Sequence, residues 1–338
     1  MSTIKDIAER TGFSLTTVSL VLNNKRRARN ITAATKAVIH EAAREMNYRP
    51  NLFARSLRAR RSYMVGLLVY DVLDPYCAPL IKHIESPLIR RGYTMLISDL
   101  GNDPKCCQKA LDTLMDRRVD GIICVANQLP IEKVDLSRTI GSVPLMLIGR
   151  RSHETRIPHF VVNEAVGGYI QGEFLLSKGH RKIAFVWDGG ENEWSALRWN
   201  GVAKAMSEAG VEPAVIVRAD NNSADAGYQA MSDLLKEKQS FTAVCAIDDL
   251  RAFGVIRALF DAGLRVPEDV SVIGFDDLAI SRYFNPTLTT VAQPLDKLGQ
   301  LAAEALLTQM KQGDQTTKAV SSRTLRPSLV ERRSTRTL

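Results

Sequence analysis

Short apolar runs alternate with longer amphipathic stretches along the chain from Met64 to its end. The short runs are rich in Val, Ile and Leu and are bounded by turn residues, which is typical of buried strands. The longer stretches place apolar residues at helical spacing, which predicts helices. The predicted strands cover 65–70, 94–98, 121–125, 145–148, 183–187, 215–217, 243–247, 270–275 and 288–291, and the predicted helices cover 77–91, 104–117, 164–178, 195–209, 224–237, 249–262 and 294–312.

Strands that alternate with helices in this way indicate an α/β fold with two doubly wound parallel sheets, one in each of two lobes. In open sheets of this kind, ligands bind beyond the carboxyl ends of the strands. Two such lobes create a cleft between them, and we expect that cleft to bind a small molecule.

A different pattern occupies the residues before Asn47. Two short helical stretches are separated by Gly12, and Thr3 with Asp6 is a candidate cap for the first of them. Ser14 is a candidate N-cap for the second helix, and Thr32 is one for a third. A helix, a tight turn and a helix describe a helix-turn-helix, whose second helix can enter the major groove of DNA. An ordinary helical hairpin is the alternative interpretation of these residues alone.

The basic excess of the chain is confined to this N-terminal part. The net charge is +8, whereas residues 1–61 carry 13 Lys and Arg against 4 Asp and Glu, which is +9, and the remainder carries 32 against 33, which is −1. Such localisation indicates a polyanionic partner. A membrane surface is the competing polyanion, but the segment lacks a basic amphipathic helix with an aromatic face, so nucleic acid is favoured.

A basic linker follows, NYRPNLFARSLRARRS at residues 47–62. Pro50 interrupts regular structure, and Asn51 can cap one short helix over 52–57 that forms only on docking. Leu57 is the apolar residue at the centre of the linker. Either it packs on the small N-terminal domain, or it inserts as a wedge at a minor-groove base step.

The sequence lacks the motifs typical of metal-binding proteins, exported or membrane proteins, and common enzymes. The five cysteines have no metal-ligand spacing, so we expect mostly buried, reduced thiols in a cytoplasmic protein without a metal. The sequence shows no signal region and no long apolar run, so we expect no export or membrane segment. The absence of GxGxxG after the first strand, of GxxxxGK[ST] and of HExxH disfavours an enzyme and a cofactor, and we expect surface or capping roles for all five histidines.

Seven motifs, taken in order, resemble landmarks of the lactose-repressor/purine-repressor (LacI/GalR) family of bacterial transcriptional regulators. They are TIKDIAERTGFSLTTVSLVLN, NYRPNLFARSLR, VDGII, KGHRKIAFV, GLRVPEDVSVIGFDD, NPTLTTVAQP and LVERRS. The resemblance covers essentially the whole chain. It implies a homodimeric repressor of double-stranded operator DNA, with a headpiece at 1–47, a hinge helix and linker at 48–62, and a core like that of periplasmic binding proteins. The core N-subdomain would comprise 63–162 and 292–320, and the C-subdomain 163–291 and 321–338.

For DNA, the resemblance implies that Leu15, Thr16 and Leu20 read bases. Leu20 stands where family members commonly have Arg, and leucine offers a base only an apolar contact, best made to a thymine methyl. We therefore expect an operator half-site that differs from the usual one at that base. Thr17 and Ser19 suit contacts to phosphates. Such contacts position the protein on DNA without specifying sequence. The remaining expected DNA contacts are Lys25 and Arg26 in the basic loop and Asn51, Arg55, Leu57 and Arg58 in the linker.

For the effector, the resemblance places contacts on both lobes. Aromatic faces can stack on a ring, while Asp and Arg give charge-assisted hydrogen bonds to polar ligands. Asp248, Asn222 and Asp74 depart from residues common in the family, which leaves the ligand open. A carbohydrate is expected from family prevalence, with a nucleobase or a sugar acid as the alternative, and Asp249 is expected to be only a helix cap. The expected effector-binding residues are Tyr76, Asn192, Trp194, Arg198, Asn222, Asp248 and Asp276.

The mechanism that follows is allosteric. Two protomers pair through the core, so that two hinge helices meet over the centre of a pseudo-palindromic operator and each headpiece occupies one major groove. Effector binding changes the angle between the lobes and thereby the pairing of the hinges. Whether the effector releases DNA or acts as a corepressor stays open. A transport-type binding protein or an enzyme on the same α/β core is the alternative of another class.

Overall fold

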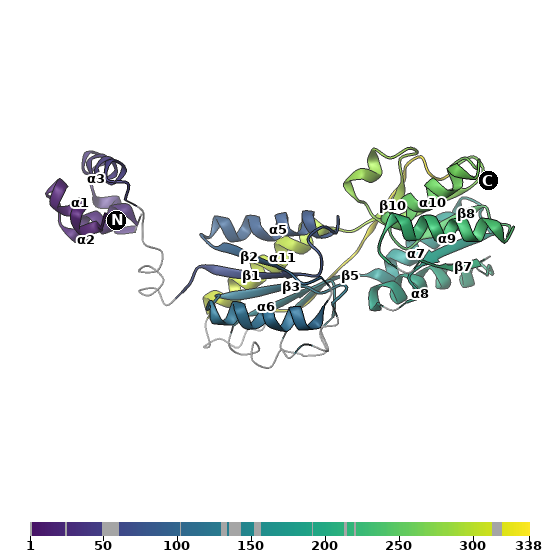
Figure 1. The fold of residues 1–338 in the computed structure, drawn as a ribbon, viewed down its shortest axis with the longest axis horizontal. Helices are drawn as coiled ribbons and strands as arrows, with labels where there is room; N and C mark the ends of the chain where they lie inside the picture. The colour runs from purple at the N-terminus through teal and green to yellow at the C-terminus, as the bar shows by residue number, and fades with distance from the viewer. Residues whose placement is uncertain are drawn as a thin grey trace. The chain divides into compact units, whose positions relative to one another are not determined.

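The computed structural model describes residues 2–23, 26–48, 61–101, 103–129, 134, 143–151, 157–190, 192–212, 215–219, 221–312 and 320–338. The chain divides into two compact units, Met1–Ser62 and Tyr63–Leu338 (Figure 1). The predicted short helix over 52–57 lies outside the described residues. So do Lys25, Asn51, Arg55, Leu57 and Arg58, and the side chain of Arg26.

The N-terminal unit is a small helical domain. Its elements are α1 (Ile4–Thr11), α2 (Leu15–Leu22), the 3-10 helix η1 (Arg26–Asn30) and α3 (Ala33–Glu45). The predicted caps are confirmed, because the side chains of Thr3, Ser14 and Thr32 each accept a hydrogen bond from a backbone N–H in the first turn of their helix. Gly12 ends α1 at φ 72°, a left-handed conformation that glycine adopts without steric cost, and so turns the chain into α2. The buried core consists of Ile7, Val18, Val21, Ile39, Ala42 and Ala43.

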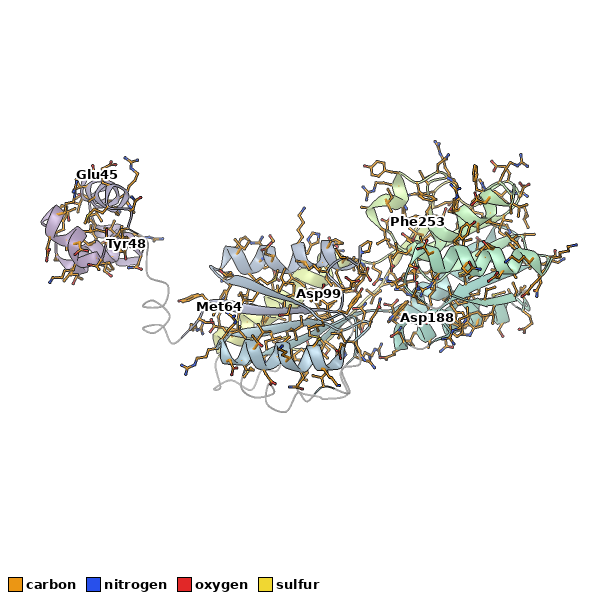
Figure 2. The ribbon with its side chains drawn as sticks, in the orientation of Figure 1. Glu45, Tyr48, Met64, Asp99, Asp188 and Phe253 are labelled. Carbon is orange, nitrogen blue, oxygen red and sulfur yellow. The ribbon has the colours of Figure 1, made fainter. Side chains whose placement is uncertain are left out.

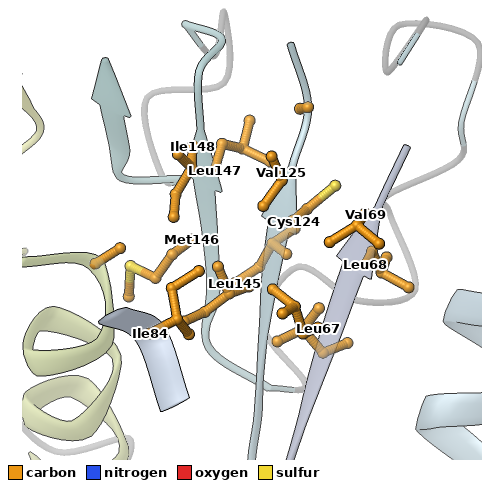
Figure 3. Packing of buried hydrophobic residues seen from close by; sticks show 14 of the residues in the cluster. Leu67, Leu68, Val69, Ile84, Cys124, Val125, Leu145, Met146, Leu147 and Ile148 are labelled. Atoms are coloured by element: carbon orange, nitrogen blue, oxygen red, sulfur yellow. The ribbon is translucent and has the colours of Figure 1, made fainter. Parts of the chain in front are cut away.

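The first lobe of the larger unit is built on a parallel sheet in the order β11-β5-β4-β3-β1-β2. Its strands are β1 (Met64–Val69), β2 (Thr94–Asp99), β3 (Gly121–Val125), β4 (Leu145–Ile148), β5 (His159–Val162) and β11 (Arg323–Leu325), and its helices are α5 (Cys77–Arg90), α6 (Pro104–Asp116) and α11 (Leu295–Gln312). Helices cover both faces. A Cβ on Gly66 would meet Leu114 of α6, whereas one on the neighbouring strand at Gly121 would meet Leu306 of α11. Figure 3 shows Leu67, Cys124 and Met146 among the apolar side chains of β1, β3 and β4 that form this core.

The second lobe is built on a sheet in the order β12-β10-β9-β8-β6-β7, parallel except for the antiparallel edge strand β12. Alternate strand residues face opposite sides: Ala184 and Val186 pack with α9 and α10, and Ile183 and Phe185 pack with α7 and α8. The strands are β6 (Ile183–Trp187), β7 (Val215–Arg218), β8 (Ala243–Ala246), β9 (Ser271–Asp276), β10 (Thr289–Ala292) and β12 (Ser328–Val330), and the helices are α7 (Glu164–Ser177), α8 (Glu193–Glu208), α9 (Ala224–Lys236), α10 (Asp249–Asp261) and the 3-10 helix η3 (Ala279–Arg282). The predicted class, a helical headpiece followed along the chain by two doubly wound parallel sheets, is thus confirmed.

The chain passes between the lobes three times, after β5, after β10 and after β11. The predicted boundary at 320/321 is wrong, because β11 (323–325) pairs in parallel with β5 and so belongs to the first lobe. The last passage therefore falls between Leu325 and Ser328. Three short strands, β5, β11 and β12, were absent from the sequence prediction.

Tight helix packing in the second lobe depends on glycine. A Cβ on Gly168 of α7 would lie 1.9 Å from the carbonyl oxygen of Arg198 in α8, and one on Gly201 of α8 would lie 2.1 Å from the carbonyl oxygen of Ala165. Any larger residue would push the two backbones apart. This contact fixes α8, and with it Arg198, against the sheet.

Two expectations about single residues have different outcomes. Among the cysteines, Cys106 is exposed and the other four are buried and free, as expected. The expectation of surface or capping histidines is wrong for His180, which is fully buried and hydrogen-bonded to Thr242 Oγ1 and to the carbonyl oxygen of Arg336. Within the described part of the chain, no helix is long and apolar enough to cross a membrane.

Candidate functional site

The carboxyl ends of the strands in the larger unit meet at one cleft between its lobes. In the first lobe, β1 starts at Met64, far from the second lobe, and β2 ends at Asp99 on the side toward it (Figure 2). Asp188, at the end of β6, lies at the edge of the second lobe that faces the first (Figure 2). The inner part of the cleft is lined by Tyr70, Asp74, Tyr76, Asn127, Gln128, Trp194, Arg198, Asn222, Asp248, Leu250, Asp276, Leu278 and Gln293.

Six of the seven predicted effector residues therefore line the inner part. The seventh, Asn192, lines the adjoining outer part, a space of about 570 Å³ whose lining also includes Asp71 and Asp188. Asn192 donates to Asp188 Oδ2 over 3.3 Å, and Asp188 also accepts from Ser195 and from the backbone N–H of Gly190. Asp188 thereby holds the start of α8 in place.

Arg198 is the central cation of the inner cleft and is 3% exposed. Its Nε donates to Glu164 Oε2 over 2.7 Å, Nη1 to the carbonyl oxygen of Ile247 over 2.7 Å, and Nη2 to Asp276 Oδ1 over 3.3 Å. The guanidinium also lies 3.6 Å from the ring centroid of Phe275 and 4.6 Å from that of Trp194. Burial raises the pKa of Glu164, and Arg198 opposes that shift. The arginine is thus fixed by two carboxylates, a carbonyl and two rings.

Asp276 ends β9 in a strained conformation, with φ 115°. Gln293 Nε2 donates to its Oδ1 over 2.7 Å, and the following residue, Asp277, also at positive φ, is ion-paired with Arg332 at 2.5 Å. Burial raises the pKa of Asp276 well above its ordinary value, although Arg198 opposes the shift. The surrounding contacts therefore hold the backbone of Asp276 in an unfavourable conformation, with its carboxyl at the cleft.

A chain of hydrogen bonds joins the lobes across the cleft. Asn222 Nδ2, on the second lobe, donates to Asp74 Oδ2, on the first, over 3.0 Å, and Tyr70 donates to the same oxygen over 2.8 Å. Arg251 Nη1 donates to Asn222 Oδ1 over 3.3 Å and is also ion-paired with Asp248. The three residues noted as departures from the family pattern, Asp74, Asn222 and Asp248, thus belong to a single network.

The expected roles of two adjacent aspartates need a correction. Asp249 was expected to cap a helix, but the cap of α10 is Asp248, which accepts from the backbone N–H of Arg251 over 2.7 Å. Asp249 is fully buried below the cleft and accepts from Leu278 N, Ser281 Oγ and Thr290 Oγ1. Burial raises its pKa to about 7, and these hydrogen bonds oppose the shift.

Three buried polar atoms without a partner belong to described residues that line the inner cleft. They are Trp194 Nε1, Gln293 Oε1 and Asn127 Oδ1. Leaving such an atom unpaired costs roughly 1–3 kcal/mol, so each is a candidate to contact a ligand. Tyr76 is 5% exposed, and burial raises the pKa of its hydroxyl although a hydrogen bond with Asn127 lowers it.

Several lining residues were missed by sequence reasoning. Asn127 follows β3 and Gln293 follows β10, so the rule that ligands bind beyond strand ends could have found both. Arg251, which lines the outer part, and Glu164, which does not line the cleft but binds Arg198, lie within helices, and no sequence signal distinguishes them from surface charges. Across the described residues, no group of three or more His, Cys, Asp and Glu could hold a metal ion.

The headpiece offers a second candidate surface, on α2. Val18 and Val21 face the core, while Leu15 is 52% exposed and Thr16 is exposed beside it. Thr17, Ser19 and Leu20 are half-buried, and the backbone N–H of Thr17 is held by Ser14 Oγ at 3.1 Å. The predicted reading residues thus lie on the outer side of a helix that is anchored by its valines.

Comparison with known proteins identifies the family. Residues 3–51 match the family described as bacterial regulatory proteins, lacI family, and residues 173–335 match the periplasmic binding protein-like domain. The HTH-type transcriptional repressor PurR of Erwinia tasmaniensis is 35% identical over 339 residues, which span 99% of this chain and 97% of that protein. The chain belongs to the lacI family. This lacI-family member is therefore a DNA-binding transcriptional repressor that responds to a small-molecule effector.

Solved structures agree with this assignment. The lac repressor dimer bound to operator and the anti-inducer ONPF has a TM-score of 0.84 at 28% identity and covers 99% of both chains. A LacI family transcriptional regulator from Enterococcus faecium with bound ribose has a TM-score of 0.72 at 28% identity, over 81% of this lacI-family chain and 99% of that one.

Proposed function

We propose that this repressor binds a carbohydrate in the cleft between its lobes, through Tyr76, Asn192, Trp194, Arg198, Asn222, Asp248 and Asp276. The observation that carries the proposal is the coincidence of a preformed polar cleft with buried atoms that lack a partner, Trp194 Nε1 and Gln293 Oε1. Carboxylates and amides can accept hydrogen bonds from sugar hydroxyls, and the Trp194 N–H can donate to one. The ribose bound by the Enterococcus faecium regulator supports this class of ligand. A nucleobase is the second candidate, because Tyr76 and Trp194 offer aromatic faces.

A pair of tryptophan variants tests the site. Trp194→Phe keeps an aromatic ring and removes only the unpaired N–H, so it should weaken effector binding by roughly 3- to 10-fold, the worth of one hydrogen bond. Trp199→Phe is the matched control, because Trp199 lies on the same helix, packs on Phe185 with ring centroids 4.8 Å apart, and does not line the cleft. The ligands are a panel of neutral sugars, sugar derivatives and nucleobases, screened by thermal shift and titrated by calorimetry. Equal affinities for both variants would contradict the assigned site.

On the DNA side, we propose that Leu15, Thr16 and Leu20 contact base edges and that Thr17 and Ser19 contact phosphates. The exposure of Leu15 and Thr16 on α2 supports this arrangement. We extend the proposal to Lys25, Arg26, Asn51, Arg55, Leu57 and Arg58, with Leu57 as a minor-groove wedge. If Leu57 is a wedge, Leu57→Ala should weaken operator binding by a few kcal/mol and leave nonspecific binding almost unchanged. Equal losses on both kinds of DNA would indicate a packing role.

We further propose that the repressor acts as a homodimer in the cytoplasm and is not an enzyme. Large apolar side chains exposed on both lobes support pairing through the core: Phe260 is 70% exposed, Tyr283 78%, Ile280 51% and Ile89 58%. Ile280 lies in η3 and Tyr283 directly follows it, and neighbouring exposed apolar side chains of this kind are typical of protein–protein contacts. Sedimentation velocity of the full chain tests this, since Tyr283→Asp should convert a dimer into monomers. A monomeric parent protein would contradict the proposal.

A further inference from the structure

The side chains that line the cleft include more carboxylates than cations. The described lining residues include two arginines, Arg198 and Arg251, and no lysine. The same lining includes five carboxylic side chains, those of Asp71, Asp74, Asp188, Asp248 and Asp276. Because charges in a partly desolvated cleft are poorly screened, this excess acts directly on any ligand that enters.

Both arginines are already neutralised by the protein. Arg198 is bonded to Glu164 and Asp276. Arg251 is 2% exposed, is ion-paired with Asp248, and donates to Asn222 and to the carbonyl oxygen of Ala219. A phosphate or carboxylate on a ligand could reach only the remaining N–H groups of either guanidinium, whose positive charge the neighbouring carboxylates already offset.

Acceptors predominate among the remaining groups. Asp71, Asp74 and Asp188 have no cationic partner among the residues that the structure describes. Among the described residues that line the cleft, Gln293 Oε1 and Asn127 Oδ1 are buried acceptors without a donor, and Trp194 Nε1 is a buried donor without an acceptor. Hydroxyl groups satisfy such a set, because each can donate to an acceptor and also accept from the indole N–H.

The N-terminus of α10 is also occupied by a carboxylate. Helix N-termini favour negative charge, and α10 begins at the cleft. However, Asp248 occupies that position, and its own carboxylate accepts from the backbone N–H of Arg251. At this N-terminus, a negatively charged ligand would meet the carboxylate of Asp248, which already interacts with the helix dipole.

We infer that the cleft selects an uncharged, polyhydroxylated ring and rejects phosphorylated and carboxylated derivatives of that ring. This inference rests on the proposed carbohydrate function and narrows it. It excludes sugar phosphates and sugar acids as effectors of this repressor. Charge, in addition to shape, thus determines which sugar metabolites the repressor detects.

Calorimetry on the full-length protein with matched ligands tests the inference. The pairs are D-ribose with ribose 5-phosphate, D-glucose with glucose 6-phosphate and with glucuronate, and cellobiose with cellobionate. Where a neutral sugar binds, its anionic counterpart should bind at least tenfold more weakly. An anionic member that binds as tightly as its neutral counterpart, or less than tenfold more weakly, would overturn the inference and leave the carbohydrate function intact. If neither the neutral nor the anionic members bind while a nucleobase does, the carbohydrate function itself fails.

A charge variant separates the cleft from the overall charge of the protein. Asp71→Asn keeps an oxygen for the backbone N–H of Leu73, 2.8 Å away, and removes one negative charge from the outer cleft. It should bring the affinities of neutral and anionic ligands closer together by several-fold. Asp116→Asn, on the exposed face of α6, changes the net charge equally and should leave the ratio unchanged. The same shift in both variants would overturn the assignment to the cleft.

Discussion

Replacing Arg198 by methionine should destabilise the second lobe strongly. The side chains of Arg198 and Glu164 are 4% and 7% exposed, and that of Asp276 is 13% exposed. Methionine keeps much of the packing against Trp194 and Phe275 but leaves both carboxylates without their cation. Removing one partner of a buried ion pair typically costs about 3–5 kcal/mol. For a unit of this size, that loss corresponds to a decrease of roughly 6–20 °C in the melting temperature.

The cost should depend on pH with a definite sign. Burial already raises the pKa of Glu164, and without Arg198 the opposing effect is gone, so its pKa in the folded state rises further. A carboxyl whose folded pKa exceeds its unfolded value favours folding while protonated and costs stability as the pH rises. The deficit of Arg198→Met relative to the parent protein should therefore be larger at pH 8 than at pH 5.5, by about 1 kcal/mol or more.

Tryptophan fluorescence is the assay, because all three tryptophans, Trp187, Trp194 and Trp199, lie in the second lobe. Arg257→Met is the matched control, since it removes an exposed pair with Asp261 in the same lobe and should cost less than about 1 kcal/mol. Adding Glu164→Gln to Arg198→Met should recover part of the loss. A cost of Arg198→Met that equals the control, or that does not change between pH 5.5 and pH 8, would refute this reasoning.

Three further outcomes follow from single residues. Burial raises the pKa of Asp249 from 3.8 to about 7, so the folded state holds an extra proton between these values and stability should fall as the pH rises through that window, by at most about 1.4 kcal/mol per unit. Asp249→Asn should flatten this slope in unfolding experiments from pH 5 to pH 8, and an unchanged slope would contradict the assignment. Gly168→Ala should lower the free energy of unfolding by about 3 kcal/mol or more through its clash with α8, whereas Gly263→Ala, with φ 77° and open space around it, should cost only about 1–2 kcal/mol, and similar losses in urea titrations would count against the helix contact. Leu20→Arg should change the preferred base at one position of each half-site to guanine in a selection from random DNA, and recovery of the same operator would contradict a base contact at that residue.

Periodicity in the sequence predicted most of the fold. The strands from β1 to β10 other than β5, and the α-helices of both lobes, lie within two residues of their predicted bounds. Their apolar runs are long enough to bury one or both faces. The strands that escaped prediction have three or four residues. β11 and β12 lie at sheet edges, and β11 joins the first lobe only because the chain returns there, which local pattern cannot reveal.

The site was predicted less evenly. Residues at strand ends, such as Asp248 and Asp276, were named from the family resemblance, and the fold places that edge at the cleft. The exchange of roles between Asp248 and Asp249 could not be read from sequence, since adjacent carboxyls at a helix start are distinguished only by what packs against them. The hydrogen bond between Asn222 and Asp74 joins residues that are 148 positions apart along the chain. It depends on the approach of the two lobes, which local sequence does not show.

We propose that ligand binding in the cleft changes operator binding. The direct measurement is the affinity of the full-length protein for its operator by fluorescence anisotropy, without effector and with saturating effector, together with effector affinity with and without operator. We expect the effector to change operator affinity by about 5- to 150-fold, a coupling of roughly 1–3 kcal/mol. Operator DNA should change effector affinity by the same factor. Operator affinity that stays the same at saturating effector would contradict it.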